Sequence, residues 1–363
     1  MRATVSEDPN VRVCSLKQGG RDGTLALMSP SGDRVLAMPA GIPTLQAALD
    51  NWRTAAPQLA TEYERLMADA GLGIPIDFAG LHSPLPRAYQ WCEGSTYLPH
   101  MERMRRARGM ELPPKHTLEP IIYQAGADTL LAPGDPIPLP DESWDLDLEA
   151  TLAVITDDVP RGTTAERASE HIAFVVLLND LTYRRLIPRE FAKSVGPYQS
   201  KPARAFAPIA ASPAVLADLW DGGRLRATVK AWVNGELLGA LATDQDNFFD
   251  FPAMIAYAAA TRELAAGTIL GTGTVANHDP ANGFGCLGEK RAVEVAQTGD
   301  TATPWLTDGD VVRIEAFAPD GSSLFGAIEQ RVVGGQASAV CSGAADWSGL
   351  SITTCNGQPE TRG

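Results

Sequence analysis

The stretch WDLDLEATLAV, residues 144–154, contains the pattern that decides the fold and points toward a site. Carboxylates alternate in it with apolar residues, so an extended strand would place Asp145, Asp147 and Glu149 on one face. Carboxylates crowded on one face repel one another unless a positive group lies between them. The stretch therefore predicts either a strand with a cation-binding face or an edge strand whose acidic face lies in water.

Two further acidic residues stand at positions that suit a site. The run IAFVVLLND, residues 172–180, predicts a buried strand that ends at Asn179 and Asp180. An Asp at the end of a buried strand has a fixed backbone and can serve as a ligand or catalytic group, although it can equally cap a turn. Glu93 lies in a predicted Gly/Ser loop, seven residues before His100.

Five sequence blocks, in order, resemble the fumarylacetoacetate hydrolase family. The resemblance covers roughly residues 85–335, and the joint order and spacing of the blocks carry it, because no block is specific alone. The blocks are EGSTYLPH (93–100), DLE (147–149), NDLTYR (179–184), Lys201 with Phe206 and Pro208, and TGT…FGCLGE (272–289).

The resemblance implies a role for each matching residue. It implies that a water is activated by a His/Glu pair beside a metal held by acidic side chains, with a lysine next to that metal. The implied catalytic residues are His100, Glu289 and Lys201, the implied metal ligands are Glu93, Asp147, Glu149 and Asp180, and the implied substrate contacts are Tyr123, Arg184, Thr274 and Arg108, with Arg106 as the alternative to Arg108.

Three positions depart from the family pattern. Glu93 stands where many relatives have Asp, and Asp147 stands where Glu is usual, so one side chain is longer and another shorter by a methylene. Ala205 stands where a Thr is common, which removes a hydroxyl and leaves the family's substrate geometry open.

Charge arithmetic supports a bound cation. Four carboxylates carry a charge of −4, and a divalent cation with Lys201 contributes +3, which leaves about −1. Oxygen ligands favour Mg²⁺ first, with Mn²⁺ or Ca²⁺ as alternatives, over Zn²⁺, which prefers Cys and His. No two of the five histidines stand at the H-x-x-x-H spacing of a zinc protease.

The resemblance implies cleavage of a carbon–carbon bond in a 1,3-diketo acid of the fumarylacetoacetate or acylpyruvate type. The metal would polarise the carbonyl, and His100, oriented by Glu289, would deprotonate the water. Decarboxylation, isomerisation, hydration or ring opening of a related 2-oxo acid at the same centre stays open, and so does a catalytically silent binding protein. A purely structural β-roll is the remaining alternative.

The amino-acid composition limits the kinds of binding partner that this protein is expected to have. A net charge of −14 argues against nucleic acid and anionic membranes, so an anionic substrate would need local positive groups. No run approaches the roughly 20 apolar residues of a membrane span, and no signal-peptide core opens the chain, so a cytoplasmic enzyme is expected. The resemblance implies a homodimer. Cys341 and Cys355 could pair only in an oxidising compartment.

The chain is expected to be α+β and mostly β, with the mixed β-sheet roll of the family behind a small N-terminal β/helix domain. The predicted parts are residues 1–85, the catalytic domain 86–335 and a flexible tail 336–363. The predicted elements are short strands within 11–38, a helix over 44–70, helices at 163–171 and 249–264, and hairpins about Asn234-Gly235 and 319–321.

Overall fold

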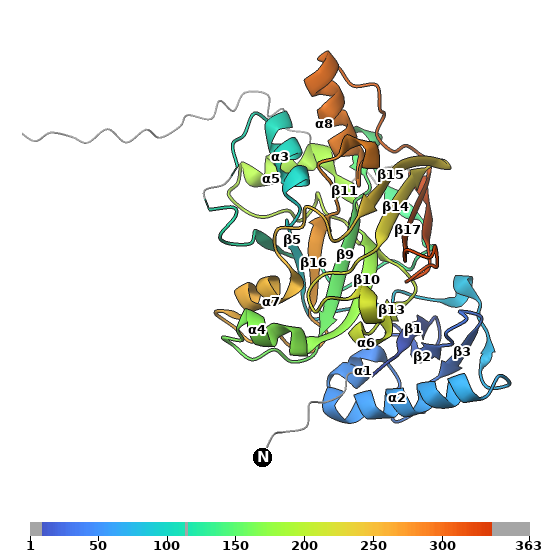
Figure 1. The fold of residues 1–363 in the computed structure, drawn as a ribbon. Helices are drawn as coiled ribbons and strands as arrows, with labels where there is room; N and C mark the ends of the chain where they lie inside the picture. Colours follow the sequence, from blue (N-terminus) through green and yellow to red (C-terminus); the bar gives the residue numbers. More distant parts are fainter. Residues whose placement is uncertain (1–8, 113–114, 336–363) are drawn as a thin grey trace, which may run out of the picture.

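The structure is a computed structural model that describes residues 9–112 and 115–335 (Figure 1). The predicted tail, with Cys341 and Cys355, lies outside the described residues. Among the helices of the described residues, none combines the length and the apolar composition that crossing a bilayer requires.

The N-terminal part is a small sheet covered by two helices. The expected strands form, but the expected long helix is divided at Asp50 and Asn51, residue types that favour helix ends over helix interiors. Its elements are β1 Arg12–Leu16, β2 Thr24–Met28, β3 Arg34–Ala37, α1 Leu45–Leu49, α2 Trp52–Ala68, β4 Ile74–Pro75 and η1 Phe78–Gly80.

The main sheet runs without interruption from the N-terminal part into the rest of the molecule. Strand β1 pairs antiparallel with β13, so the order is β4-β3-β2-β1-β13-β10-β9-β16-β5-β6, with β12 paired to β10. Pairing is mixed, because β16 and β5 run parallel. The added strands are β5 Trp91–Gly94, β6 Ile122–Ala125, β9 Ala150–Thr156, β10 Ile172–Asn179, β12 Ala205–Phe206, β13 Ala210–Ala211 and β16 Ile269–Thr274.

A second sheet has the order β15-β14-β17-β18-β7. Asn234 and Gly235 both have positive φ, at 53° and 81°, as a type I′ turn requires, which confirms the first hairpin. Strands β17 and β18 also pair antiparallel, across a longer connection than predicted. The strands are β7 Ile137–Leu139, β14 Thr228–Val233, β15 Glu236–Ala242, β17 Val311–Phe317 and β18 Ile328–Gly334, beside a small pair, β8 Leu146–Asp147 and β11 Thr182–Tyr183.

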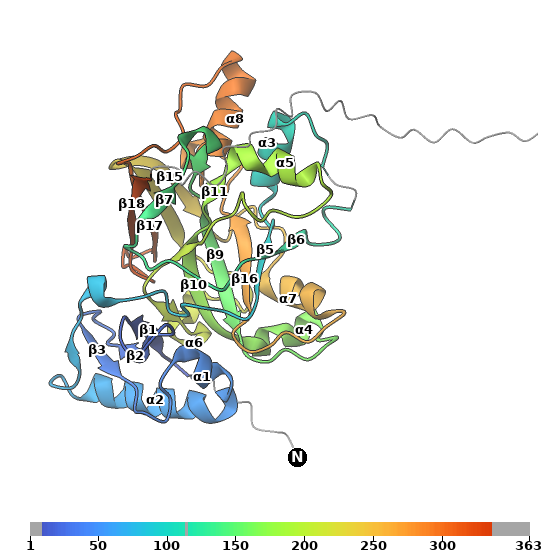
Figure 2. The same ribbon diagram turned by 180° about the vertical axis from the view of Figure 1, so that it is seen from behind.

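Helices gather at the two ends of the central strands. Helices α3, α5 and α8 lie at one end, and α4 and α7 lie at the other, in both views (Figures 1 and 2). Helix α3 packs directly against α8. The helices are α3 Leu98–Ala107, α4 Ala165–Ala168, α5 Ile187–Phe191, α6 Pro213–Leu216, α7 Phe251–Ala259 and α8 Leu287–Thr298, with 3-10 turns η2 Glu142–Trp144, η3 Ser169–His171, η4 Arg184–Leu186, η5 Ala217–Leu219 and η6 Pro280–Asn282.

The stretch that predicted an acidic face starts its strand later than expected. Trp144 belongs to a 3-10 turn, and Asp145 has φ of 59°, so extended backbone begins at Leu146. Asp147 and Glu149 are buried, at 0% and 4% exposure, and β9 lies in the interior of the main sheet. The interpretation as a solvated edge strand is therefore wrong, and the two carboxylates need partners inside the protein.

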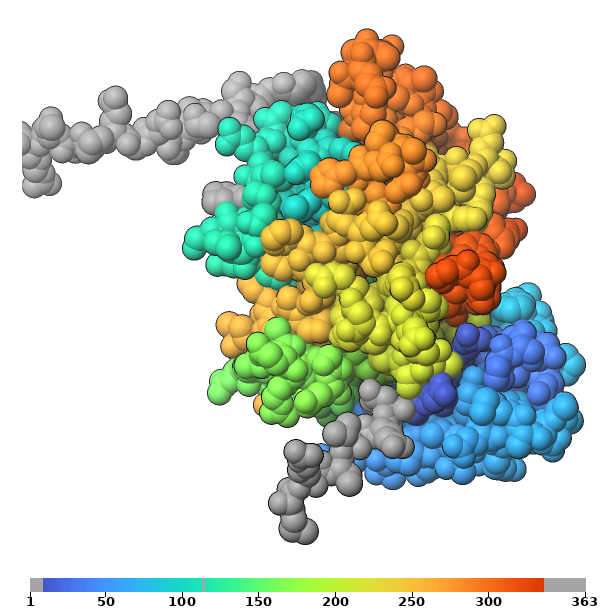
Figure 3. Space-filling view, in the orientation of Figure 1, coloured from blue at the N-terminus to red at the C-terminus, as the bar shows by residue number. Residues whose placement is uncertain are grey.

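The N-terminal part packs as a lobe against the rest of the molecule (Figure 3). One hydrophobic cluster contains Val13 and Leu59 from this lobe together with Trp91 and Phe174 from the central strands. The fold is thus mostly β with covering helices, as predicted, and its two parts share one core.

Candidate active site

A pocket of about 170 Å³ opens at the end of the sheet where α3, α5 and α8 gather. Its wall includes residues that the sequence predicted for the site, contributed by strands, helices and loops far apart in the chain. The predicted residues that line it are Glu93, His100, Arg108, Tyr123, Glu149, Arg184, Lys201 and Thr274. The other three, Asp147, Asp180 and Glu289, lie behind this wall and are fully buried.

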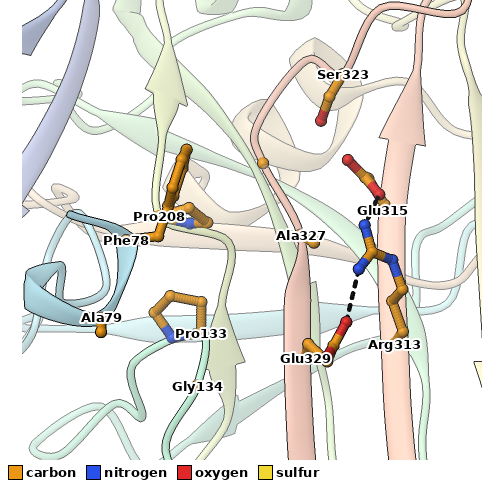
Figure 4. A pocket seen from close by; sticks show the side chains of 11 residues that line it. Phe78, Ala79, Pro133, Gly134, Pro208, Arg313, Glu315, Ser323, Ala327 and Glu329 are labelled. Carbon is orange, nitrogen blue, oxygen red and sulfur yellow. Dashed lines mark hydrogen bonds and ion pairs between the residues drawn. The ribbon is translucent and has the colours of Figure 1, made fainter. Parts of the chain in front are cut away.

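A larger hollow of about 450 Å³ lies elsewhere, between β17, β18 and the segment around Phe78 (Figure 4). Its charged side chains satisfy one another, because Arg313 bonds to both Glu315 and Glu329 at 2.6 Å. The rest of its lining is mostly apolar or glycine, so it lacks the unpaired polar groups that mark the smaller pocket.

His100 and Glu289 come together because α3 packs against α8. His100 lies in the first turn of α3, and Glu289 lies in the first turn of α8, whose N-cap is Cys286. The His100 Nδ1 atom is 3.6 Å from Glu289 Oε1, beyond a direct hydrogen bond. Among the described residues, His100 Nδ1 and Glu289 Oε2 are buried without a hydrogen-bond partner, so a small polar molecule could bridge them.

Arg103 also holds Glu289, from the same helix as His100. Its Nη1 donates to Glu289 Oε1 at 3.4 Å, and its Nη2 donates to the carbonyl of Asn277 at 2.7 Å. The guanidinium therefore fixes one carboxylate oxygen of Glu289 and leaves the other free to accept a bond from a ligand.

Asp147 anchors the start of α8. Its carboxylate accepts bonds from the backbone N–H groups of Leu287 and Gly288 at 2.8 and 2.9 Å. Arg184 donates to the same carboxylate through Nε at 2.8 Å and lies within 2.7 Å through Nη2. Both oxygens are occupied, which identifies Asp147 as the anion at the helix N-terminus that precedes Glu289.

Glu149 and Asp180 are joined by Lys201. The ammonium donates to Glu149 Oε2 at 2.7 Å, to Asp180 Oδ2 at 2.6 Å and to the Thr182 hydroxyl at 2.7 Å, which uses its three donors. Arg184 Nη2 lies 2.6 Å from the other oxygen of Glu149. Although burial opposes ionisation, Lys201 and Arg184 together lower the pKa of Glu149.

Arg204 pairs with the second oxygen of Asp180. Its Nε donates to Asp180 Oδ1 at 2.7 Å, and the arginine is 1% exposed. Burial lowers the pKa of Arg204, but the charge of Asp180 outweighs burial and raises it. Each oxygen of Asp180 therefore faces its own cation.

Glu93 has different surroundings. Its Oε1 accepts a bond from the N–H of Gly273 at 2.5 Å, while Oε2 is buried without a partner among the described residues. Burial, and then the charges of Asp180 and Glu149, raise its pKa well above the ordinary value. Burial and the neighbouring anions thus shift the pKa of Glu93 in the direction that favours the neutral acid at the pocket wall.

The glycines of β16 make room for Glu93. A Cβ atom at Gly271 would lie 2.7 Å from both carboxylate oxygens of Glu93, so a side chain there would force this carboxylate to shift. Thr274, the last residue of the same strand, turns a buried hydroxyl without a partner toward the pocket. The Tyr123 hydroxyl donates to Asp180 Oδ2 at 3.3 Å, and Tyr123 lines another side of the pocket.

Sequence reasoning missed Arg103, Arg204 and the helices α3 and α8. Glu93 was placed in a loop, whereas it lies in strand β5, between buried Cys92 and Gly94. Arg204 directly precedes Ala205, and an arginine three residues after Lys201 in an apolar run is the sequence signal that could have identified it. Of the two arginine alternatives, Arg108 lines the pocket and Arg106 does not.

The fold and the pocket define an enzyme of the β-roll type that carries acid–base groups at one end of its central strands. A family model described as the C-terminal domain of fumarylacetoacetate hydrolase matches residues 90–333, and one described as fumarylacetoacetase N-terminal domain 2 matches residues 11–87. The chain therefore belongs to the fumarylacetoacetate hydrolase family.

Relatives in this family have several activities. The oxaloacetate tautomerase YisK of Bacillus subtilis is 27% identical over 53% of this chain and 61% of its own length, and the mitochondrial oxaloacetate tautomerase FAHD1 of Bos taurus is 28% identical over 53% and 83%. Among solved structures, maleylpyruvate hydrolase of Sphingobium sp. SYK-6 with manganese(II) and pyruvate has a TM-score of 0.57 at 20% identity, covering 90% of this chain and all of that one.

The acids of this chain fit a divalent cation poorly. A metal ion could be shared by three or more Asp, Glu, His or Cys side chains whose ligand atoms lie close together. Within the described part of the chain, the only such group is His100, Cys286 and Glu289. The four predicted acids do not form one. The next side chain on the face of Glu149 is Thr151, a neutral hydroxyl. The four-acid Mg²⁺ site stays a prediction, and the observed arrangement of these side chains does not favour it.

The His100, Cys286 and Glu289 group is also a weak metal site. A cysteine ligand must be a thiolate, whereas burial, followed by the charge of Asp147, raises the pKa of Cys286 well above its ordinary value. Arg103 already neutralises Glu289. The group is better suited to acid–base chemistry than to holding an ion.

Proposed function

We propose that this enzyme hydrolyses a carbon–carbon bond in a short 1,3-diketo acid of the acylpyruvate type. The observation that carries the proposal is the pair of unpartnered buried atoms, His100 Nδ1 and Glu289 Oε2, at the pocket. A water between them would donate one proton to His100 Nδ1 and the other to Glu289 Oε2, which suits activation of its oxygen for attack on a carbonyl.

His100 would take a proton from that water while Glu289 stabilises the imidazolium, and the resulting hydroxide would add to the substrate carbonyl. Collapse of the adduct breaks the carbon–carbon bond, and the bonding electron pair leaves as an enolate of the second carbonyl fragment. A proton then returns to that carbon, and two acids are released. Lys201 has its donors engaged, so it acts on the substrate through its charge and through the acids that it fixes.

Positive groups at the pocket suit an anionic substrate. Arg105 and Arg108 line the pocket on the side of α3, where either could bind a carboxylate. The Thr274 hydroxyl is a further donor for a carbonyl or enolate oxygen. A cavity of about 170 Å³ favours a substrate of a few carbon atoms.

Keto–enol tautomerisation of a 2-oxo dicarboxylate is the second candidate. It needs only a base and an acid on the two sides of an enol, and Glu93, a carboxyl group on the pocket wall whose pKa burial raises well above its ordinary value, would serve as an acid in addition to His100. Two tautomerase relatives have the same family domain, at 27% and 28% identity.

The test is proton NMR of acetylpyruvate, fumarylpyruvate, fumarylacetoacetate and oxaloacetate with the protein in D₂O. Two acid products from a diketo acid, with turnover lost in Glu289→Gln, support the hydrolase. Accelerated enol–keto exchange without cleavage moves the assignment to the tautomerase. Loss of carbon dioxide alone from oxaloacetate, or no reaction with any of the four, contradicts both.

A further inference from the structure

We infer that Arg204, Lys201 and Arg184 form a fixed internal counter-charge for Asp147, Glu149 and Asp180, which closes this centre to divalent cations in the resting protein. The inference concerns the side chains behind the pocket and does not depend on which reaction the enzyme performs. The family likeness assigns a metal beside Lys201 and Arg184, whereas in this chain these two cations and Arg204 already pair with the acids that would hold it.

Arg204 is held in place on several sides. Besides the bond to Asp180, its Nη1 donates to the carbonyl of Gly126 at 3.3 Å, and its guanidinium lies 5.9 Å from the ring centre of Trp91. Both Arg204 and Trp91 are buried. Such an arginine cannot swing into solvent to make room for an ion, so its charge stays beside Asp180.

Lys201 lies at the point that a bridging cation would take. It is within 2.7 Å of one oxygen of Glu149 and within 2.6 Å of one oxygen of Asp180. A metal bound to the same two oxygens would have to lie about 2.0–2.6 Å from each, and so would collide with the ammonium. Lys201 would therefore have to leave its three partners before an ion could bind.

The charge balance no longer calls for a metal. Asp147, Glu149 and Asp180 pair with three permanent cations, Arg184, Lys201 and Arg204, and these six groups balance to zero. Counting Glu93 as ionised leaves a net charge of −1 without a metal, whereas a count with Lys201 as the only cation needs a divalent ion to reach the same value. An added ion would give this centre excess positive charge in a buried place.

The experiment measures Mn²⁺ binding to the full chain. Binding is monitored by the electron paramagnetic resonance signal of free Mn²⁺ and by calorimetry. We expect the wild type to bind Mn²⁺ only at millimolar concentrations. Arg204→Ser keeps a small polar group and removes the charge, and we expect it to bind one Mn²⁺ per chain at least tenfold more tightly. Arg313→Ser is the matched control, because Arg313 pairs with two carboxylates away from the pocket, and its Mn²⁺ affinity should equal that of the wild type.

Two further variants locate the bound ion, and circular dichroism checks that every variant is folded. Adding Glu149→Gln to Arg204→Ser should cancel the gain, and Lys201→Met should produce a similar gain by removing the other cation. Each variant is compared with the wild type by circular dichroism. Micromolar Mn²⁺ binding by the wild type that Glu149→Gln abolishes would overturn the inference, as would folded Arg204→Ser and Lys201→Met proteins with unchanged affinity. Wild-type binding that survives Glu149→Gln but is lost in Cys286→Ala would lie at the other group and leave the inference standing.

Discussion

Neighbouring carboxyl groups differ in this protein because their partners differ. Glu149 touches two cations and its pKa is lowered, although burial acts in the opposite direction, whereas burial and two nearby anions raise the pKa of Glu93. The two shifts act in opposite directions, so the surroundings favour the anion of Glu149 and the neutral acid of Glu93. Such a divergence of two acids in one pocket is typical of acid–base catalysis.

Glu289→Gln tests the acid–base pair of His100 and Glu289 by changing the residue that is fully buried. The amide keeps the size of the side chain but cannot stabilise an imidazolium, so we expect kcat to fall about 100-fold or more, within the usual range for general acid–base groups. Steady-state assays on the reactive substrate measure the loss. Lys290→Gln, the next residue on α8, serves as the control and should keep wild-type turnover. Equal kcat values for Glu289→Gln and the wild type would show that the pair is not part of the chemistry.

Arg108→Ala tests which arginine meets the substrate carboxylate. Arg108 lines the pocket and Arg106 does not, so we expect Arg108→Ala to raise KM about tenfold or more, as loss of a charged hydrogen bond does, while Arg106→Ala leaves KM unchanged. The two variants carry the same change two residues apart on the chain. A larger KM effect for Arg106→Ala would reverse the assignment.

At the scale of elements, Asp147 connects strand β8 to helix α8. It accepts from the first N–H groups of the helix, in buried contacts, and from Arg184, in a partly buried one. Asp147→Asn leaves Arg184 with one fewer anion, and loss of one partner of a buried ion pair costs about 3–5 kcal/mol of unfolding free energy. We also expect kcat to fall, because the helix that positions Glu289 loses its anchor.

Chemical denaturation and steady-state kinetics measure the two effects of Asp147→Asn. Asp145→Asn is the matched control, since Asp145 has positive φ, a conformation that Asn tolerates, and its side chain has no part in the contacts of Asp147. An Asp147→Asn protein as stable and as active as the wild type would refute the anchoring role.

His278 ties the loop between β16 and α8 to the loop after β15. Its Nδ1 lies 2.8 Å from Asp246 Oδ1. The bond to Asp246 raises the pKa of His278 above 6.5, and the same bond, against burial, lowers the pKa of Asp246 below 3.8. The histidine's contribution to stability is therefore complete below pH 6.5 and lost as the pH rises through its folded-state pKa, while the aspartate's contribution is lost only in acid.

We accordingly expect His278→Ala to lower the melting temperature at pH 5.5 and to have no effect at pH 9. The pair is exposed, so the loss at pH 5.5 should be at most about 1 kcal/mol. Thermal melts at the two pH values measure it, and in an Asp246→Asn background the difference between them should shrink to the part that Glu102, 3.5 Å from His278 Nε2, supplies. A His278→Ala effect that grows toward pH 9 would show that the pair stabilises the loop in some other way.

The sequence predicted strands better than helices, for a physical reason. Strand β10 is an unbroken apolar run, and the β14–β15 hairpin has its Asn-Gly turn, so both can be read locally. Helix α3 holds Pro99 at its start and several arginines, so its buried Met101 and Met104 form only a short apolar stripe, and α8 starts after a glycine-rich loop. Both helices are fixed by packing against each other and by Asp147, contacts between residues far apart in the chain.

The same limit applies to the site. Eight of the residues named from motif order line one pocket, because strand ends and loops of this fold converge there. It could not reveal that Asp147 faces a helix N-terminus or that Arg204 neutralises Asp180, since neither partner is close in sequence to the acid that it binds. Partner identity, and hence the state of each carboxyl group, came only from the three-dimensional arrangement.

At the scale of the whole molecule, the N-terminal part and the rest are joined by a continuous sheet and a common core. Strand β1 pairs with β13, and the Trp52 ring of α2 meets the Phe174 ring of β10 edge-on, with centroids 5.4 Å apart. Two parts that share their buried surface in this way should not unfold independently. We therefore expect one cooperative transition, with the same midpoint by calorimetry and by near-ultraviolet circular dichroism of the tryptophans.

Phe174→Ala sharpens this expectation, because Phe174 is fully buried in the cluster that both parts share. Removing the ring should cost about 3–5 kcal/mol and lower the midpoint, yet the transition should stay single, since the cavity weakens both parts together. Val295→Ala on the exposed side of α8 is the control and should leave the midpoint nearly unchanged. If the wild type or Phe174→Ala instead melts in two steps, with one step confined to the probes of the N-terminal part, the continuous sheet joins two units that keep separate stabilities.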